Sequence, residues 1–249
     1  MCRSLKPMSK DIGMIPRAVS GLFEMIKAYR KMYNRTYTVI IIPHESFFRN
    51  ISAKKVYCSF LQIYNEKIFD LLNPVQMAKI NQSSPGLRLR WKQKDEFVVE
   101  NLYVFECKTA DEVLEHFHNG IKNRIVASHK LNLSSSRSHT ILSLKVESVD
   151  LQKPENFLVS KLDLVDLAGS EKTSLTGNES SVAQKESIEI NKSLFTLRQV
   201  ISTLSDFQKG LGEKKKPAHI PYRDSKLTCL LKQSIGGNCY CLMVNFFLQ

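Results

Sequence analysis

Apolar side chains recur every three or four positions in four stretches of the chain, which indicates helices. These predicted helices cover Asp11–Ile26, Thr109–Val126, Val182–Leu204 and Ser225–Ile235. Pro16 is permitted in a first turn, Thr109 and Glu112 have the spacing of a capping box, and Gly236 begins a Gly-Gly stop. The most regular apolar stripe, in the third helix, consists of Ile190, Leu194, Leu197, Ile201 and Leu204.

Alternating or continuous apolar runs indicate strands. They are predicted over Val56–Tyr64, Thr140–Val149, Phe157–Val165 and Tyr240–Leu248, with a hairpin around Leu87–Val104. The run Phe157–Val165 is mostly apolar, as is typical of a buried strand. Asn65–Leu72 is interpreted as a short helix that Asn73 and Pro74 end. The segment Tyr29–Ala53 is basic, polar and broken by Pro43, so an irregular insert with one strand at Tyr37–Ile42 is expected.

Helices and strands mixed along 249 residues predict one large α/β domain with a sizeable core, spanning residues 1–249. No run of eighteen apolar residues occurs, and the first residues lack the apolar stretch of a signal peptide. A soluble, intracellular protein with no membrane partner is therefore expected.

The formal net charge is +12, which favours a polyanionic partner such as nucleic acid, an anionic membrane or an acidic protein surface. Composition alone does not choose among these, and a well-solvated basic surface would have the same charge. A nucleic-acid binder is disfavoured because no aromatic residues are interleaved on a basic face. The six cysteines form no C-x-x-C pair and match no histidine spacing, so neither a zinc site nor a disulfide framework is predicted.

Two polar constellations carry candidate chemistry. An apolar strand leads into Asp166-Leu-Ala-Gly169-Ser-Glu171, where the carboxylate could hold Mg²⁺ and the glycine could let a backbone N–H approach a phosphate. The second, Asn132-Leu-Ser-Ser135-Ser136-Arg137-Ser138-His139, offers hydroxyls for Mg²⁺ or water and an arginine that could pair with a carboxylate. Taken separately, each has a plain alternative: a common strand end for the first, and a serine-rich, phosphorylatable turn for the second.

Together, in this order and about thirty residues apart, the two constellations resemble switch I and switch II of kinesin motor domains. The resemblance includes further segments of the chain: 13–17, 60–66, 70–72, 190–194, 219–228 and 236–238. It implies an α/β fold of the kinesin P-loop NTPase type, with a central, mostly parallel or mixed sheet flanked by helices. It also implies a microtubule motor of the cytoplasm and cytoskeleton that uses ATP and Mg²⁺.

The resemblance assigns roles residue by residue. Catalytic roles fall on Ser135, Ser136, Arg137 and Glu171, and nucleotide-binding roles fall on Asn132, Ser138, Asp166, Gly169, Asn191 and Arg124. Arg137 and Glu171 would pair in a latch that closes with ATP bound and helps position the attacking water. Ser136 and Asp166 would lie beside the metal ion. For Asn191 and Arg124, a polar position on a helix surface is the alternative.

The same resemblance implies a surface that faces tubulin, an acidic partner. Lys172, Arg223 and Lys226 match its basic positions, and Lys214–Lys216 lie in the intervening loop. Exposed contacts of this kind contribute about 1 kcal/mol each and weaken with salt. Cys229 occupies a position that is commonly basic in the family, which argues against tight binding.

The phosphate-cradling string G-x-x-x-x-G-K-[ST] is absent from the sequence, as are the strands that precede it in the family. This polypeptide alone is therefore expected to bind ATP very weakly, to show no measurable hydrolysis and to have poor stability, all of which calorimetry and thermal unfolding can check. Two functions remain: an ATP-driven motor domain in an intact parent protein, or a nucleotide-independent microtubule-binding module. Cosedimentation that ATP does not change would favour the second.

Overall fold

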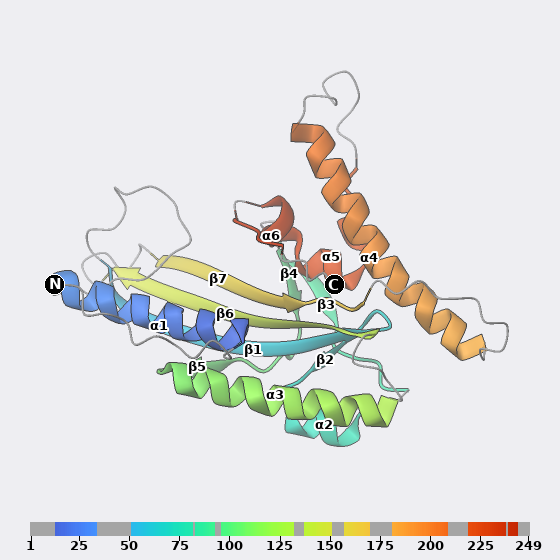
Figure 1. Ribbon diagram of the computed structural model, residues 1–249, viewed down its shortest axis with the longest axis horizontal. Coiled ribbons are helices and arrows are strands. Elements are labelled where there is room, and N and C mark those ends of the chain that lie inside the picture. The colour runs from blue at the N-terminus through green and yellow to red at the C-terminus, as the bar shows by residue number, and fades with distance from the viewer. Residues whose placement is uncertain are drawn as a thin grey trace. The chain divides into compact units, whose positions relative to one another are not determined.

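The computed structural model describes residues 13–33, 51–81, 83–92, 96–131, 137–150, 157–169, 181–208, 219–237 and 239–243. Its helices are α1 (Met14–Tyr33), α2 (Pro74–Lys79), α3 (Ala110–Leu131), α4 (Ser181–Gln208), the 3₁₀ turn η3 (Tyr222–Asp224), α5 (Lys226–Leu230) and α6 (Lys232–Gly236). Its strands are β1 (Ile51–Tyr64), β2 (Lys67–Asp70), β3 (Leu89–Lys92), β4 (Glu96–Val99), β5 (Phe105–Cys107), β6 (His139–Asp150) and β7 (Phe157–Asp166). Figure 1 labels these elements, and the α/β class expected from the sequence is confirmed.

Five strands form one sheet, in the order β2-β1-β6-β7 with β5 also paired to β1. The β3–β4 hairpin forms a second, two-stranded sheet, as predicted around Leu87–Val104. The pairings β1–β2, β1–β5 and β3–β4, whose registers are defined, are antiparallel. The defined pairs are therefore antiparallel, where a mostly parallel or mixed sheet was expected, because β1–β2 and β3–β4 are hairpins and β5 runs back along β1.

The predicted helix over Asn65–Leu72 is wrong, because this segment turns back as strand β2. Asn65 and Glu66 both have positive φ, 48° and 52°, and they form the two-residue connection of a β1–β2 hairpin. Asn73 and Pro74 do not end a helix but begin one. The Asn73 side chain accepts the Gln76 N–H, and Pro74 takes the first position of α2.

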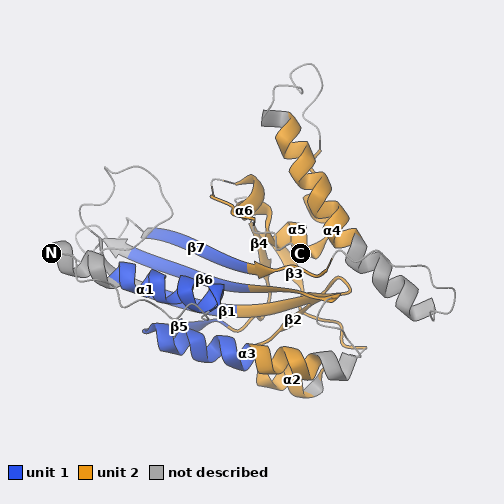
Figure 2. Cartoon of the chain, viewed as in Figure 1, with its two compact units in different colours: residues 1–59, 104–120, 142–164 blue, residues 60–103, 121–141, 165–249 orange. Residues whose placement is uncertain are grey.

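The chain forms two compact units, coloured in Figure 2. Unit 1 comprises residues 1–59, 104–120 and 142–164, and unit 2 comprises residues 60–103, 121–141 and 165–249. The candidate site lies in unit 2, which has a buried apolar cluster of its own. Its members are Leu61, Ile63, Ile68, Val99, Ile141, Leu197, Leu227 and Leu231. Side chains from the β1–β2 hairpin, β4, α4 and α5 therefore share one core.

The long helix α4 forms as predicted, but its buried face only partly coincides with the predicted stripe, which shares Leu197 with it. Leu197 and Val200 are buried, and so are the polar side chains of Ser193 and Thr196. Ile201, a member of the predicted stripe, is 38% exposed. A prediction from apolar spacing considers apolar residues alone, whereas the buried face of α4 includes the hydroxyls of Ser193 and Thr196.

The helix predicted over Ser225–Ile235 is divided at Leu231 into α5 and α6. The Ser225 side chain accepts the Leu227 N–H at the start of α5, and α6 ends at Gly236. Gly236 lies against the Tyr222 hydroxyl so closely that a β-carbon at this position would overlap it. This is a close approach that only glycine permits.

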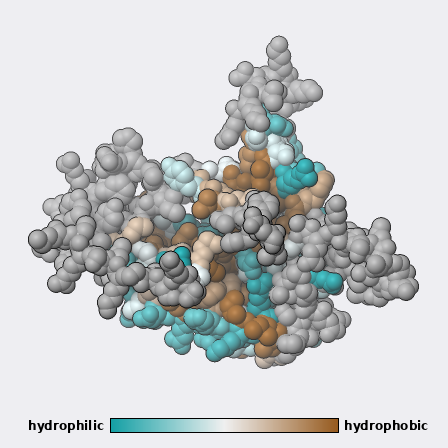
Figure 3. All heavy atoms as spheres, in the orientation of Figure 1, coloured by the Kyte–Doolittle hydropathy of each residue, from teal (hydrophilic) through white to brown (hydrophobic). Residues whose placement is uncertain are grey.

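Two strand predictions need correction. The strand β7 forms, but its described residues are half-buried or exposed as whole residues, because β7 ends the strand order and is not covered as a central strand would be. Tyr240–Met243, predicted as the start of a final strand, is neither helix nor strand and is exposed; residues 244–249 lie outside the described residues. Figure 3 shows apolar and hydrophilic side chains interspersed on the face in view.

The segment predicted as an irregular insert overlaps two regular elements, since α1 runs to Tyr33 and β1 begins at Ile51. Its remaining residues, 34–50, including the strand expected at Tyr37–Ile42, lie outside the described residues. None of the described helices combines the length and apolar character needed to cross a membrane.

Candidate nucleotide-sensing site

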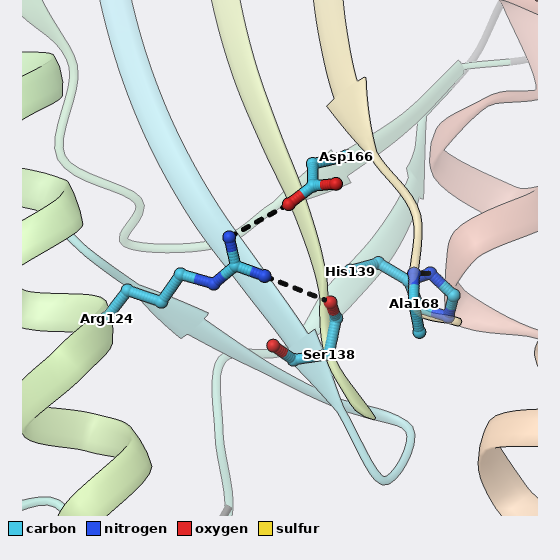
Figure 4. Close-up of polar contacts among 5 residues, drawn as sticks. All are labelled: Arg124, Ser138, His139, Asp166 and Ala168. Atoms are coloured by element: carbon cyan, nitrogen blue, oxygen red, sulfur yellow. Dashed lines mark hydrogen bonds and ion pairs between the residues drawn. The ribbon is translucent and has the colours of Figure 1, made fainter. Parts of the chain in front are cut away.

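Arg124 joins the ends of strands β6 and β7. Its Nη1 donates to Asp166 Oδ2 at 2.9 Å, and its Nη2 lies 3.5 Å from the carbonyl oxygen of Ser138. Figure 4 shows the guanidinium extending from α3 between the two strand ends. The structure therefore brings together three of the residues assigned nucleotide-binding roles: Arg124, Ser138 and Asp166.

The Asp166 carboxylate of this ion pair is accessible to solvent. The Arg124 side chain is 15% exposed, whereas that of Asp166 is 58% exposed. Water therefore screens the pair, and its contribution to stability is at most about 1 kcal/mol. Ser138 Oγ is buried and has no hydrogen-bond partner among the described residues. An exposed carboxylate, a fixed guanidinium and an unpaired hydroxyl thus meet at one end of the sheet.

His139 connects the turn after β7 to the long helix. Its Nδ1 accepts the backbone N–H of Ala168 at 2.9 Å, and its Nε2 lies 2.8 Å from Ser193 Oγ on α4. Because the Ala168 N–H can only donate, Nδ1 is unprotonated and the ring proton lies on Nε2, which donates to Ser193. Burial lowers the pKa of His139 to about 4, although the nearby Asp166 carboxylate acts in the opposite direction. The imidazole is therefore neutral at pH 7.

Several residues assigned roles by resemblance lie outside the described part of the chain. Residues outside the described part of the chain are Asn132, Ser135, Ser136, Glu171, Lys172 and Lys214–Lys216, and the Asn191 side chain lies outside it too. Arg137 is half-buried just before β6, and Gly169 is half-buried after β7. Because Glu171 is not described, the latch between Arg137 and Glu171 stays a prediction, as does a shared metal at Ser136 and Asp166.

The residues assigned to the polymer-facing surface lie around η3 and α5. Arg223 is exposed and Lys226 is half-buried. Glu66, in the β1–β2 turn, accepts the Ser225 hydroxyl at 3.1 Å and the Lys226 N–H at 2.7 Å. The Cys229 thiol is buried, donates to the Tyr222 carbonyl, and has its pKa raised to about 11 by burial. Cys229 therefore packs inward and presents no charge at this surface.

Replacing Glu66 with alanine is expected to destabilise the fold by about 1–3 kcal/mol, because two donors at the start of α5 lose a charged acceptor. Glu66→Gln retains one side-chain oxygen and should lose less than half as much. Urea unfolding followed by circular dichroism measures both. Equal midpoints for Glu66→Ala and the parent chain would contradict this role.

Glu66 and the roles of His139 and Ser193 were not identified from the sequence. Glu66 was assigned to a helix that does not form, so its contact with α5, 160 residues later, had no local signal. In the sequence, His139 appears only as the last residue of its motif. A polar position on the buried face of a long helix, such as Ser193, was the available sign of a buried partner.

ATP and Mg²⁺ are the groups that the family implies for this site, and the described residues fit them. Arg124 and the unpaired Ser138 hydroxyl suit a phosphate oxygen, and the exposed Asp166 carboxylate suits Mg²⁺ directly or through water. Among the described residues, no group of three His, Cys, Asp or Glu side chains could hold a metal ion. A hydrated Mg²⁺ that binds one carboxylate and phosphate oxygens needs no such group.

Proteins similar in sequence to this chain are kinesin-like proteins. The chain is 39% identical over 238 residues to the kinesin-like protein KIN-12D of Arabidopsis thaliana, which covers 95% of the chain but 8% of that protein. It is 37% identical over 214 residues to the kinesin-like protein KIF18B of Gallus gallus, covering 83% of the chain and 25% of that protein. The chain thus spans a small part of these relatives.

Solved structures of kinesins share the fold. A fast kinesin matches with a TM-score of 0.67 and 32% identity, over 89% of this chain and 52% of that one. The KIF14 dimer, solved with AMP-PNP in complex with a microtubule, matches with a TM-score of 0.70 and 33% identity, over 93% of this chain and 58% of that one. The sequence model of the kinesin motor domain matches residues 4–247, and the chain therefore belongs to the kinesin motor domain family.

Proposed function

We propose that this chain is the part of a microtubule motor that detects a nucleotide's terminal phosphate and passes that signal to a microtubule-binding surface. The observation that carries the proposal is the hydrogen-bonded connection from the turn after Asp166, through His139, to Ser193 on α4. A change in the position of Ala168 must alter this connection, because the imidazole is buried and has both ring nitrogens engaged. ATP would supply the phosphate, and Mg²⁺ would neutralise part of its charge.

The microtubule surface in this proposal is basic and lies on the same unit as the site. It comprises Arg223 and Lys226, and Lys172 and Lys214–Lys216 are assigned to it by family resemblance alone. The alternative is a module that attaches to microtubules without reference to nucleotide. Both place the protein on the cytoskeleton, and they differ in whether nucleotide changes the affinity.

Cosedimentation with microtubules tests the proposal. The 249-residue chain is expected to pellet with microtubules at low salt and to release as salt rises. Arg223→Gln should weaken binding about fivefold, the equivalent of about 1 kcal/mol. Lys55→Gln, which removes a positive charge from unit 1, is the matched control and should have no effect.

Adding AMP-PNP in place of ADP distinguishes the two functions. Because this polypeptide alone is expected to bind ATP very weakly, this comparison uses a longer form of the protein that includes the phosphate-binding string. In that form a motor domain should show a different bound fraction in the two nucleotides, and His139→Ala should remove that difference while leaving binding itself. Identical binding in both nucleotides would favour the nucleotide-independent module. A chain that fails to pellet at any salt concentration would refute both functions.

A further inference from the structure

One aromatic ring on the surface of unit 2 has two cations beside it. The Lys232 Nζ lies 4.4 Å from the centre of the Trp91 ring, and the Arg223 Cζ lies 5.1 Å from it. Trp91 comes from β3, whereas Arg223 of η3 and Lys232 of α6 follow much later in the sequence. Lys232 Nζ also lies 5.7 Å from the Tyr222 ring. Two like charges are thus gathered around one indole.

The ring itself is held in place. Trp91 is paired with Phe97 across the β3–β4 hairpin, and the two rings meet edge to face with centres 4.6 Å apart. Trp91 nevertheless remains 41% exposed. A large apolar residue that is supported by its strand partner and still open to solvent can contact both the protein and a partner.

The arginines near Trp91 have different partners. Arg90, one residue before Trp91, is paired with Glu100. Arg223 forms no ion pair with any described residue, and its contact is the indole. Two nearby cations repel each other, and the electron-rich face of an indole offsets part of that repulsion. The ring also restricts two long side chains that would otherwise lose rotamer freedom on binding.

We propose that Trp91 is a positioning residue that holds Arg223 and Lys232 ready for the carboxylates of an acidic protein segment. The proposal deepens the proposed function, because it rests on a microtubule being that acidic partner. Arg223 was assigned to the surface by resemblance, whereas Trp91 and Lys232 enter through geometry alone.

Trp91 is the only tryptophan in the chain, so it can be labelled selectively. The 249-residue chain is prepared with 5-fluorotryptophan, and its single ¹⁹F resonance is followed while polyglutamate is added. The resonance should shift at low salt and return as salt rises. Lys232→Gln should reduce the shift, whereas Lys145→Gln should not, although Lys145 also lies over a ring, that of Tyr57 in unit 1. No shift, or the same shift in both variants, would overturn the proposal.

Microtubule cosedimentation tests the positioning role itself. Trp91→Leu keeps an apolar side chain but removes the π-system, and it should weaken binding about twofold to fivefold and flatten the salt dependence. Trp91→Phe should restore part of the affinity, which a purely structural role of the indole would not require. Equal affinity and salt dependence in Trp91→Leu and the parent chain would overturn the proposal.

The two experiments separate the hypotheses. If the chain does not bind microtubules but its ¹⁹F resonance responds to polyglutamate through Lys232, the proposed function fails and the acidic-segment site stands. If the chain binds microtubules and Trp91→Leu binds equally well, the proposed function stands and the role of Trp91 fails.

Discussion

Acidification from pH 6.5 to 4 is expected to remove about 3 kcal/mol of folding free energy through one side chain, His139. Burial lowers the pKa of His139 in the folded protein to about 4, against 6.5 for an ordinary histidine. The unfolded chain therefore takes up a proton first as the pH falls. The stabilisation is fully present above pH 6.5 and is lost progressively down to pH 4.

The structural reason lies in the two hydrogen bonds of the ring. A proton on Nδ1 would face the Ala168 N–H at 2.9 Å, so one donor would oppose another in a buried place. The bond from Nε2 to Ser193 Oγ would survive protonation, because that nitrogen already carries a hydrogen. Acid should therefore release the turn after β7 before it releases α4.

Urea unfolding at pH 7, 6, 5 and 4 measures this effect against two variants. His139→Asn offers an oxygen near the place of Nδ1, and His139→Gln offers an amide N–H near the place of Nε2. Other groups titrate in both proteins, so the informative quantity is the difference between parent and variant. That difference should shrink by about 3 kcal/mol between pH 7 and pH 4, and a constant difference would contradict the assignment.

Replacing Asp70 with alanine is expected to reduce stability by about 3–5 kcal/mol. Asp70 ends strand β2, is fully buried, and accepts the N–H groups of Leu72 at 2.8 Å and Tyr103 at 2.6 Å. Hydrogen bonds to a charged acceptor are worth about 1.5–3 kcal/mol each, and their donors would be left unpaired. The loop before β5 would lose its attachment to the β1–β2 hairpin.

Asp70→Asn is the matched variant, since it keeps one oxygen and removes the ionisation. Burial raises the pKa of Asp70 above its ordinary 3.8, although the backbone N–H groups act against that shift. A raised pKa in the folded state means that this contribution is fully present below pH 3.8 and is lost as the pH rises through the folded value. The advantage of the parent chain over Asp70→Asn should therefore be larger in acid than at neutral pH. An advantage that grew with pH would be incompatible with this account.

Periodic spacing predicted most elements because it records which side chains pack. The helix at Thr109 forms, and the Thr109 hydroxyl accepts the Glu112 N–H as a capping box requires. The Glu112 carboxylate returns to the Lys108 N–H, one residue earlier than the usual partner. Local chemistry of this kind involves neighbours in the chain, and a single sequence is enough to see it.

The predictions that were wrong have a different cause. Asn65 and Glu66 adopt left-handed backbone conformations that the pattern does not signal, so the pattern predicts a helix where the β1–β2 hairpin forms. The buried hydroxyls of Ser193 and Thr196 belong to a helix face that a search for apolar residues does not identify as buried. In the site, the resemblance selected Arg124, Ser138 and Asp166. The contact of Glu66 with Lys226 depends on how distant segments meet, which spacing does not encode.

The glycine that ends α6 has a consequence for the charged surface nearby. Gly236 lies against the Tyr222 hydroxyl, and the Tyr222 ring is close to Lys232. Any larger residue at this position would displace the Tyr222 ring and so change the surroundings of the Lys232 ammonium group. A substitution of Gly236, a small and uncharged residue, would thus change where positive charge is presented to a binding partner.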